Sequence, residues 1–304
     1  MKVDMDSKKQ IIPAGDGILV LAPAKINLSL LIAGKRPDGF HEIETVMAKI
    51  DWYDEVLIQP GRKTGIELIC EGPQWAPAGE DNLVYRAAKS LMENCGLAAD
   101  VGIKLKKNIP AGTGLGSASS DAAATLIGLD HYLKLGLDKK DIFKLAADLG
   151  SDVAFFLNGP LAFCTGKGEK IKILEEIFNF TAILILPDIS ISTEKVYANY
   201  KHNRQLYEKL NIRIKEFMDK NRIDLLAKMC TNMLADSCFD LERSLAELKK
   251  TIESLGIGPC CLSGSGSAMF CIIESGDEDK TRDCMRELAE YIECESTIVR
   301  NNRW

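Results

Sequence analysis

The chain has 304 residues, of which 46% are hydrophobic, enough to build the apolar cores of two domains. A net charge of −6 and a pI near 5.3 argue against general nucleic-acid binding, which depends on neutralising many phosphates. The first ten residues are polar with mixed charge, and no apolar run approaches the ~20 residues that span a bilayer. We therefore expect a cytoplasmic protein with no nucleic-acid or membrane partner and with a disordered tail over residues 1–15.

Hydrophobic periodicity predicts an α+β fold. The expected strands cover residues 17–22, 26–32, 55–59, 65–70, 101–106, 161–165, 181–186 and 268–273. The expected helices cover residues 82–95, 117–135, 139–149, 194–200, 203–220, 224–233, 241–255 and 279–291. Strands dominate the first half and helices the second, so we predict one domain over residues 16–165 and another over residues 166–304.

Ten cysteines and three histidines raise the question of disulfides or a metal site. No cysteines have the Cys-x-x-Cys spacing of a zinc site, and no two histidines have ligand spacing. Cys70 and Cys271 lie in apolar strand contexts, where a free cysteine behaves as a small hydrophobic side chain. In a chain without a secretory leader we expect reduced cysteines and no zinc.

The segment at residues 110–121 is the most informative, and it reads Pro-Ala-Gly-Thr-Gly-Leu-Gly-Ser-Ala-Ser-Ser-Asp. It follows the expected strand at 101–106 and precedes the expected helix at 117–135. Glycines at every second position allow unusual backbone dihedrals and close approach of a ligand. Free N–H groups and the positive end of a helix dipole then converge on one point, so the segment predicts a polyphosphate-binding loop.

Two common nucleotide motifs do not fit this loop. A Walker loop needs Gly-Lys-Ser/Thr, yet no lysine occurs between Lys107 and Lys134. The dinucleotide fingerprint needs a third glycine at position 117, which is serine. A merely tight strand-to-helix turn stays open as the plain alternative, although three glycines in five residues exceed what one turn requires.

At this loop the chain resembles the GHMP kinases, which bind ATP through a Pro-x-x-x-Gly-Leu-Gly-Ser-type loop. Three more blocks support the resemblance: Ala-Pro-Ala-Lys-Ile-Asn-Leu at 22–28, Lys-Arg-Pro-Asp-Gly-Phe-His-Glu-Ile at 35–43 and Leu-Ser-Gly-Ser-Gly-Ser-Ala at 262–268. The similarity runs from about residue 18 to about residue 273. It implies a two-domain α+β architecture with the active site in the cleft between the domains, and transfer of the ATP γ-phosphoryl to a hydroxyl.

The resemblance also implies the nucleotide site. It assigns ATP binding to Pro110, Ala111, Gly112, Thr113, Gly114, Leu115, Gly116, Ser117, Ala118, Ser119 and Ser120. Mg²⁺ is expected on charge grounds, because ATP approaches a second phosphorylated molecule only with divalent screening. The sequence does not identify the Mg²⁺ ligands; Ser119, Ser120 and Asp121 are candidates.

Two charged residues are the catalytic candidates. Asp152 precedes five apolar residues, an expensive position for a carboxylate without a partner. The resemblance makes Asp152 the acceptor of the hydroxyl proton and puts Lys25 beside it, offsetting negative charge. From the residues alone, Asp152 could instead cap a helix, and Lys25 could be a surface lysine on a strand edge.

The resemblance assigns the acceptor alcohol, a small molecule bearing a cytidine diphosphate, to a further set of residues. These are Asn27, Phe40, His41, Tyr197, Gly264 and Ser265. Phe40 stands where the family usually has tyrosine, so a stacking face is kept and a phenol hydrogen bond is lost. Without the resemblance, the aromatic residues could be packing residues and Gly264 to Gly266 a hairpin turn.

One departure bears on the acceptor. Relatives that use the cytidine-linked alcohol usually carry glycines where this chain has Ser117 and Ala118, and serine at 117 is the pattern of mevalonate and homoserine kinases. A kinase for mevalonate-like or homoserine-like alcohols, and a non-catalytic nucleotide sensor, therefore remain as alternatives. A monomer and a homodimer are both compatible with the sequence.

Overall fold

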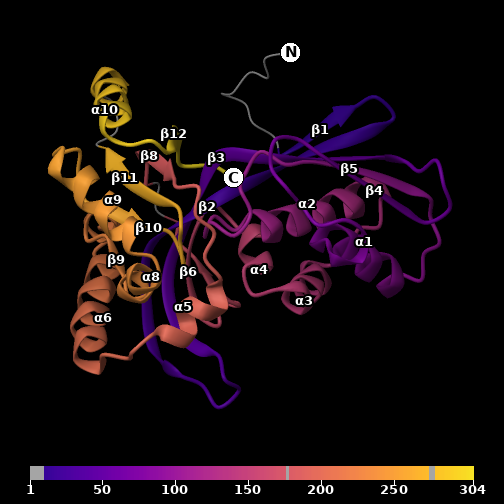
Figure 1. Cartoon of the computed structure of the whole chain (residues 1–304). Coiled ribbons are helices and arrows are strands. Elements are labelled where there is room, and N and C mark those ends of the chain that lie inside the picture. Colours follow the sequence, from indigo (N-terminus) through magenta and orange to yellow (C-terminus); the bar gives the residue numbers. More distant parts are fainter. Residues whose placement is uncertain (1–9, 176–177, 274–277) are drawn as a thin grey trace.

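Two long antiparallel strands, β2 (Gly17–Lys35) and β3 (His41–Pro60), run through the whole computed structural model (Figure 1). The structure describes residues 10–175, 178–273 and 278–304. The register of the two strands shifts at three places, between Pro23 and Lys25, between Asn27 and Ser29, and between Ile32 and Gly34. Such bulges bend and twist a strand, so the ribbon curves as it passes from one lobe to the other.

Within the described residues, eight strands form one sheet and four form a second. The larger sheet has the order β1-β2-β3-β5-β4, with β6 paired to β3 and β7, and β9 paired to β2. The smaller sheet has the order β10-β11-β8-β12. The remaining strands of the larger sheet are β1 (Ile11–Ala14), β4 (Ile66–Glu71), β5 (Val101–Lys106), β6 (Leu161–Gly166), β7 (Lys170–Ile173) and β9 (Thr231–Asn232). The smaller sheet consists of β8 (Thr181–Leu186), β10 (Cys260–Leu262), β11 (Met269–Ile273) and β12 (Glu295–Arg300).

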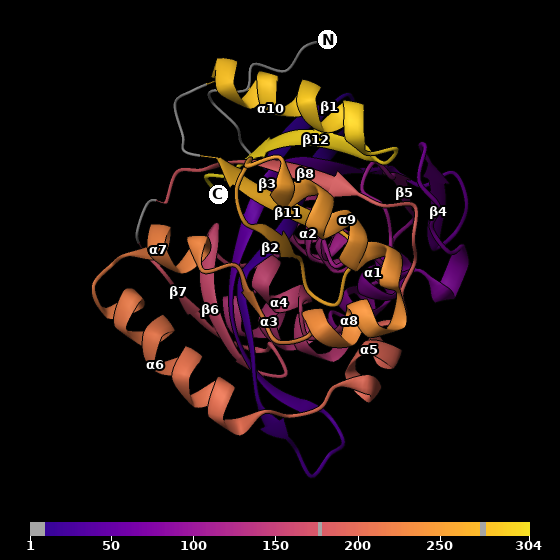
Figure 2. The same ribbon diagram turned by 60° about the vertical axis from the view of Figure 1, so that its left-hand side comes forward.

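The helices divide between two lobes (Figures 1 and 2). The N-terminal lobe holds β1, β4 and β5 with η2 (Gly79–Asp81), α1 (Leu83–Asn94), α2 (Ser117–Tyr132), α3 (Lys139–Leu149) and α4 (Val153–Phe156). The C-terminal lobe holds the smaller sheet with α5 (Thr193–Asn199), α6 (Arg204–Asp219), α7 (Ile223–Lys228), α8 (Ala235–Leu241), α9 (Arg243–Ser254) and α10 (Glu278–Tyr291). The two-domain α+β expectation is confirmed.

Helix α2 follows the glycine-rich loop, and its small residues let it pack tightly on the sheet. Ala122, Ala123 and Ala124 are buried, and a Cβ at Gly128 would lie 2.5 Å from Ile58 Cδ1. A larger side chain at Gly128 would therefore push the helix away from the sheet. Small residues thus fix the distance between the sheet and the helix that begins at the loop.

The apolar core forms two clusters, and β2 contributes to both. Val20 and Ala22 belong to the cluster of the N-terminal lobe with α1, α2 and β5. Leu30 and Leu31 belong to the cluster of the C-terminal lobe with β8, β10 and β11. The central ribbon is therefore a structural member of both lobes.

Most of the expected elements exist, but several differ in extent. Residues 41–54 of β3 are not among the expected strands, because Lys49, Asp51 and Asp54 interrupt the apolar pattern there. The expected helix at 224–233 ends at Lys228 and is followed by β9. Of the expected disordered tail at 1–15, residues 1–9 lie outside the described residues. Residues 11–14, by contrast, form β1, since Ile11 packs against the core.

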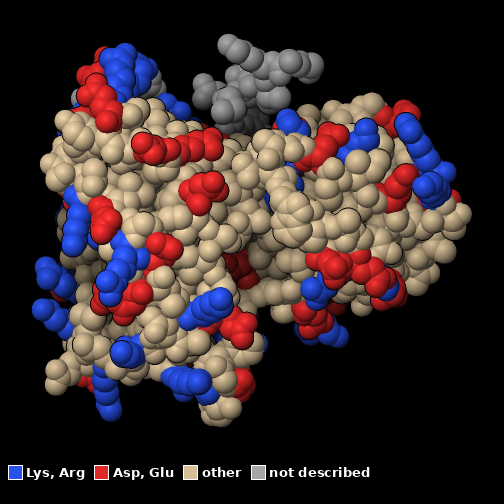
Figure 3. Space-filling model, in the orientation of Figure 1, with Lys and Arg blue, Asp and Glu red and all other residues tan. Residues whose placement is uncertain are grey.

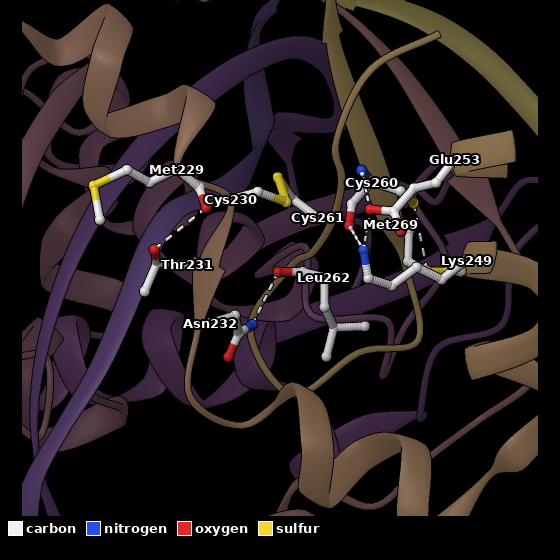
Figure 4. The surroundings of a disulfide bond; sticks show 10 residues. All are labelled: Met229, Cys230, Thr231, Asn232, Lys249, Glu253, Cys260, Cys261, Leu262 and Met269. Atoms are coloured by element: carbon white, nitrogen blue, oxygen red, sulfur yellow. Dashed lines mark hydrogen bonds and ion pairs between the residues drawn. A yellow bond between two sulfur atoms is a disulfide. The ribbon is translucent and has the colours of Figure 1, made fainter. Parts of the chain in front are cut away.

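The expectation that all cysteines are reduced is wrong for one pair. Cys230 and Cys261 form a disulfide that joins the segment after α7 to β10 (Figure 4). Beside it, Asn232 on β9 donates to the carbonyl oxygen of Leu262 at 2.9 Å. The separation of 31 residues between the two cysteines gives no spacing signal in the sequence. The other eight cysteines are free.

On the face drawn in Figure 3, positively and negatively charged side chains are mixed, and neither sign dominates. Among the described residues, none of the helices combines the length and apolar character needed to cross a bilayer. A site for a highly charged ligand must therefore be built locally.

Candidate active site

A cavity of about 780 Å³ lies between the lobes, where the surface is hollowed (Figure 3). Its walls come from β2, the start of β3, the loop before α2, the turn before α4, helix α5 and the loop after β10. Each wall carries residues singled out from the sequence. The volume is in the range of small-molecule sites.

The glycine-rich loop has the backbone that the sequence predicts. Gly112, Gly114 and Gly116 have φ values of 72°, 79° and 71°, a backbone region that residues other than glycine rarely adopt. Gly116 is the N-cap residue of α2, so the first turn of a 16-residue helix forms part of the cavity wall. The partial positive charge at that helix end favours an anion such as phosphate.

Both lobes hold the loop in place. The backbone N–H of Lys25 donates to Leu115 O at 2.9 Å, and its ammonium Nζ donates to Gly114 O at 2.7 Å. From the C-terminal lobe, Ser263 Oγ donates to the same Gly114 carbonyl at 2.9 Å. A Cβ at Gly114 would lie 2.1 Å from Ser263 O. Glycine is thus required at position 114 both for its dihedrals and for this close approach.

A buried charge cluster lies beneath the loop. The Lys107 ammonium contacts Asp54, Asp121 at 2.6 Å and the Ser117 hydroxyl. Asp54 also accepts the backbone N–H of Ile109 at 2.9 Å, just before the loop begins. Burial raises the pKa of Asp121 well above its usual range, and the Asp54 charge adds to this. Burial opposes the charged form of Lys107, but the two carboxylates together raise its pKa.

The cluster changes the interpretation of two candidates. Asp121, a candidate Mg²⁺ ligand, is buried against Lys107 and is absent from the cavity wall. Ser117 lines the cavity, but its hydroxyl is held by Lys107 and donates to Asp54 at 2.9 Å. Asp54 and Lys107 were not found from the sequence. The sequence offered one clue to them. Lys107 directly follows β5, and β5 pairs with β3, the strand that carries Asp54.

Lys25 and Asp152 open into the same cavity. Lys25 is only 3% exposed, which rules out a surface lysine, and its ammonium donates to Asn27 Oδ1 at 2.6 Å. Burial lowers the pKa of Lys25, and the charge of Asp152 acts against that shift. Asp152 is the N-cap residue of α4, although its side chain makes no capping hydrogen bond. Its carboxylate is thus left available at the cavity wall.

Aromatic and basic side chains line the other end of the cavity. The ring centroids of His41 and Tyr197 are 5.2 Å apart, and Tyr200 meets the His41 ring edge-on at 5.8 Å. Phe40 is 55% exposed, and Lys167 Nζ lies 4.6 Å from its ring centroid. Burial lowers the pKa of His41, and the positive charge of Lys35 lowers it further. Tyr200, Lys35 and Lys167 were not found as site residues from the sequence.

The loop after β10 completes the wall. Ser265 Oγ is 2.8 Å from Thr193 Oγ1 at the start of α5. Asn232 Nδ2 donates to Gly264 O at 2.7 Å, which ties this loop to β9. Of the residues that the sequence assigned to catalysis, ATP or the acceptor, only Ser120 does not line the cavity, because it is buried within α2. Those that do are Lys25, Asn27, Phe40, His41, Pro110, Ala111, Gly112, Thr113, Gly114, Leu115, Gly116, Ser117, Ala118, Ser119, Asp152, Tyr197, Gly264 and Ser265.

A glycine-rich loop at a helix N-terminus, with a lysine bound to it and a carboxylate on the same interlobe cavity, defines the class of small-molecule kinases. Two family profiles match the chain: "GHMP kinases N terminal domain" over residues 82–160 and "GHMP kinases C terminal" over residues 214–290. The chain belongs to the GHMP kinase family.

Individual relatives cover most of the chain. It is 36% identical over 256 residues to a 4-diphosphocytidyl-2-C-methyl-D-erythritol kinase of Bacillus cytotoxicus, covering 84% of this chain and 88% of the relative. It is 37% identical over 267 residues to a kinase of the same name from Chloroherpeton thalassium, covering 87% and 92%. A crystal structure of 4-(cytidine 5'-diphospho)-2C-methyl-D-erythritol kinase matches with a TM-score of 0.75 and 31% identity, covering 94% of this chain and all of the other.

Proposed function

We propose that this chain transfers the γ-phosphoryl group of ATP to the 2-hydroxyl of 4-diphosphocytidyl-2-C-methyl-D-erythritol, a step in non-mevalonate isoprenoid biosynthesis. One observation carries the proposal. The phosphate loop, the pair Lys25 and Asp152, and the aromatic group at Phe40, His41 and Tyr197 all open into a single cavity. The names of relatives at 36% and 37% identity point to the same acceptor.

The phosphate loop is the proposed ATP site. Its left-handed glycines and the first turn of α2 form a cradle, and a side chain at Gly114 would disrupt it by pressing against Ser263 O. When bound, ATP would supply an electrophilic γ-phosphorus, and Mg²⁺ would screen the negative charge of the phosphate oxygens. Ser119 lines the cavity and is the remaining candidate from the α2 turn to face the metal.

Asp152 and Lys25 are the proposed catalytic residues. Asp152 accepts the hydroxyl proton as the new oxygen–phosphorus bond forms and the bond to the ADP oxygen breaks; the proton then leaves to solvent. Lys25 offsets negative charge on the transferred group. The same ammonium binds the carbonyl of Gly114, which places its positive charge at the proposed ATP loop.

The aromatic end of the cavity is the proposed acceptor site. Phe40 offers a stacking face for cytosine, and the neutral His41 ring has one donor and one acceptor nitrogen to read the base edge. Lys35 and Lys167 line the same end and bring two positive charges for a diphosphate. Asn27, held between Lys25 and Thr45, is positioned for a substrate hydroxyl.

The serine at 117 gives little support to another acceptor. Its hydroxyl is engaged with Lys107 and Asp54, which gives it a role in anchoring the loop. Mevalonate-like and homoserine-like acceptors, and a non-catalytic sensor, are outcomes that the experiment below distinguishes. A cytoplasmic location and a monomeric or homodimeric state stay predictions.

The test is ADP release measured with 4-diphosphocytidyl-2-C-methyl-D-erythritol, mevalonate and homoserine, with wild type and Asp152→Asn. We expect turnover with the cytidine-linked alcohol alone. In the variant we expect a loss of about 100-fold or more in kcat with ATP affinity retained. Turnover of mevalonate or homoserine instead would show that one of these alcohols, and not the cytidine-linked one, is the acceptor. ATP binding without ADP release on any alcohol would favour the sensor, and wild-type kcat in Asp152→Asn would remove this residue from the mechanism.

A further inference from the structure

Lys49 is a buried lysine that the proposed chemistry does not use. It lies on β3 directly opposite Lys25 on β2 and is 1% exposed. It is absent from the cavity wall. Burying a lysine costs free energy, and the cost is larger when another lysine lies opposite it. A specific set of contacts must therefore hold it there.

The Lys49 amine binds carbonyl groups. Nζ donates to Phe156 O at 3.0 Å and to Asn158 O at 2.6 Å, and none of the described ion pairs includes it. Burial lowers its pKa to about 7. A neutral amine still has two N–H donors, the number of carbonyls that it binds. Its backbone N–H also donates to Pro160 O at 2.8 Å, so Lys49 holds the chain on both sides of Asn158.

The carbonyls that Lys49 binds belong to the end of α4. This helix spans only Val153–Phe156, and Asp152 is its N-cap residue. A helix of one turn has almost no stability of its own, so contacts from outside set its orientation. Lys49 supplies such contacts at one end, while Asp152 faces the cavity at the other.

The same helix touches the phosphate loop. A Cβ at Gly116 would lie 2.9 Å from Phe156 Cζ and 3.1 Å from Lys25 Cγ. The Phe156 ring is fully buried at this contact. The ring is thus held by its contact with the loop, and a shift of the Phe156 carbonyl would be transmitted along α4 to Asp152.

We infer that Lys49 is a positioning residue for Asp152, fixing the C-terminal end of α4 so that the carboxylate is held against the reacting hydroxyl. The inference rests on the proposed role of Asp152 as base. Lys49 does not line the cavity in which ATP and the acceptor are proposed to bind, so we expect its removal to affect the chemical step rather than binding. Misplacing a catalytic group by about 1 Å is enough to lower a rate up to about 100-fold.

The test is steady-state kinetics of Lys49→Met, Asp152→Asn and the double variant, on protein shown to be folded by circular dichroism. We expect kcat of Lys49→Met to fall about 10- to 100-fold, with KM for ATP and for the acceptor within about twofold of wild type. In the Asp152→Asn background, Lys49→Met should cause no further loss, because the group that it positions is gone. A structural lysine acting elsewhere would give the same factor in both backgrounds.

Lys106→Met is the matched control, because it removes a half-exposed lysine of the same sheet whose partner is Glu55. Its kinetics should stay at wild type. If Lys49→Met does not fold, Lys49→Gln, which keeps two N–H donors on a shorter side chain, takes its place with the same expectation for kcat. Unchanged kcat, equal loss in both backgrounds, or a rise in KM for ATP that accounts for the loss would each overturn the inference. A full effect of Asp152→Asn beside an inert Lys49→Met would reject Lys49 alone and leave the proposed function intact.

Discussion

The two ends of the cavity are built differently. At the phosphate loop, Gly114 is fixed by hydrogen bonds from both lobes, and the charges of Lys107, Asp54 and Asp121 are buried underneath. At the acceptor end, Phe40 is more than half exposed on a turn, and its neighbours are aromatic rings and lysines with few hydrogen bonds between them.

This difference between the two ends separates the requirement for ATP binding from the requirement for acceptor specificity. Because the loop is already held in place before ATP arrives, little of the free energy of ATP binding is lost in ordering it. An acceptor end whose side chains are exposed, like Phe40, or half-buried, like His41, can change its contacts with less effect on the fold, so specificity can vary there independently. Substitutions at the first end should therefore affect folding and nucleotide binding, and those at the second should affect only the acceptor.

The largest expected effect is on the charge cluster. Lys107→Met leaves Asp54 and Asp121 buried without their cation, and we expect the free energy of unfolding to fall by about 3–5 kcal/mol. Urea unfolding followed by circular dichroism measures the change. Lys106→Met, one residue earlier and half-exposed, should change it by less than about 1 kcal/mol. Equal effects of the two variants would show that the cluster does not anchor the loop.

The next effect concerns the loop itself. Gly114→Val places a β-branched residue at positive φ and against Ser263 O, and we expect ATP affinity to fall more than about 100-fold, equivalent to about 2.8 kcal/mol. Gly136→Val is the matched control, since Gly136 also has positive φ, but a Cβ added there would meet no atom within 4 Å. Calorimetric titration with ATP on both folded variants measures the difference. Retained affinity in Gly114→Val would contradict the cradle.

At the acceptor end, Phe40→Ala should act on one ligand only. Loss of a stacking face costs about 1–3 kcal/mol, so KM for the cytidine-linked alcohol should rise roughly 5- to 150-fold. KM for ATP should stay within about twofold. His41→Ala should follow the same pattern. If both variants weaken ATP binding as much as acceptor binding, the residues at 40 and 41 are structural, and the distinction between the two ends fails.

The smallest expected effect depends on pH. Because the pKa of His41 is lowered, the ring is neutral at pH 7 and keeps an acceptor nitrogen. As pH falls through that pKa the nitrogen gains a proton, so KM for the acceptor should rise about 2- to 5-fold between about pH 7.5 and pH 5.5. His41→Gln, which has both a donor and an acceptor but does not titrate, should flatten the profile. An unchanged profile in this variant would assign the titration to another group.

Local signals in the sequence predict the backbone around the glycine-rich loop well. The alternation at Val101–Lys106 and the glycines before Ser117 predict the bounds of β5 and the start of α2, because each signal lies within a few residues. The site residues taken from the family blocks also converge on one cavity.

Buried charges could not be predicted in this way. Lys107 and Asp54 are 53 residues apart, and Lys49 binds carbonyls more than 100 residues away. Hydropathy patterns treat each of these residues as exposed, and the partner that makes burial possible is visible only in three dimensions. The disulfide between Cys230 and Cys261 was missed for the same reason.

The unbroken passage of β2 and β3 through both lobes limits how this enzyme can move. Strands of 19 and 20 residues, paired along almost their whole length, resist the hinge rotation by which many two-lobed proteins close on a ligand. Any opening of the lobes would have to bend the ribbon at its bulges. The loop at residues 263–267 is itself held by hydrogen bonds to Gly114, Thr193 and Asn232. Closure over bound molecules is therefore left to the exposed turn at residues 36–40, where the ribbon ends.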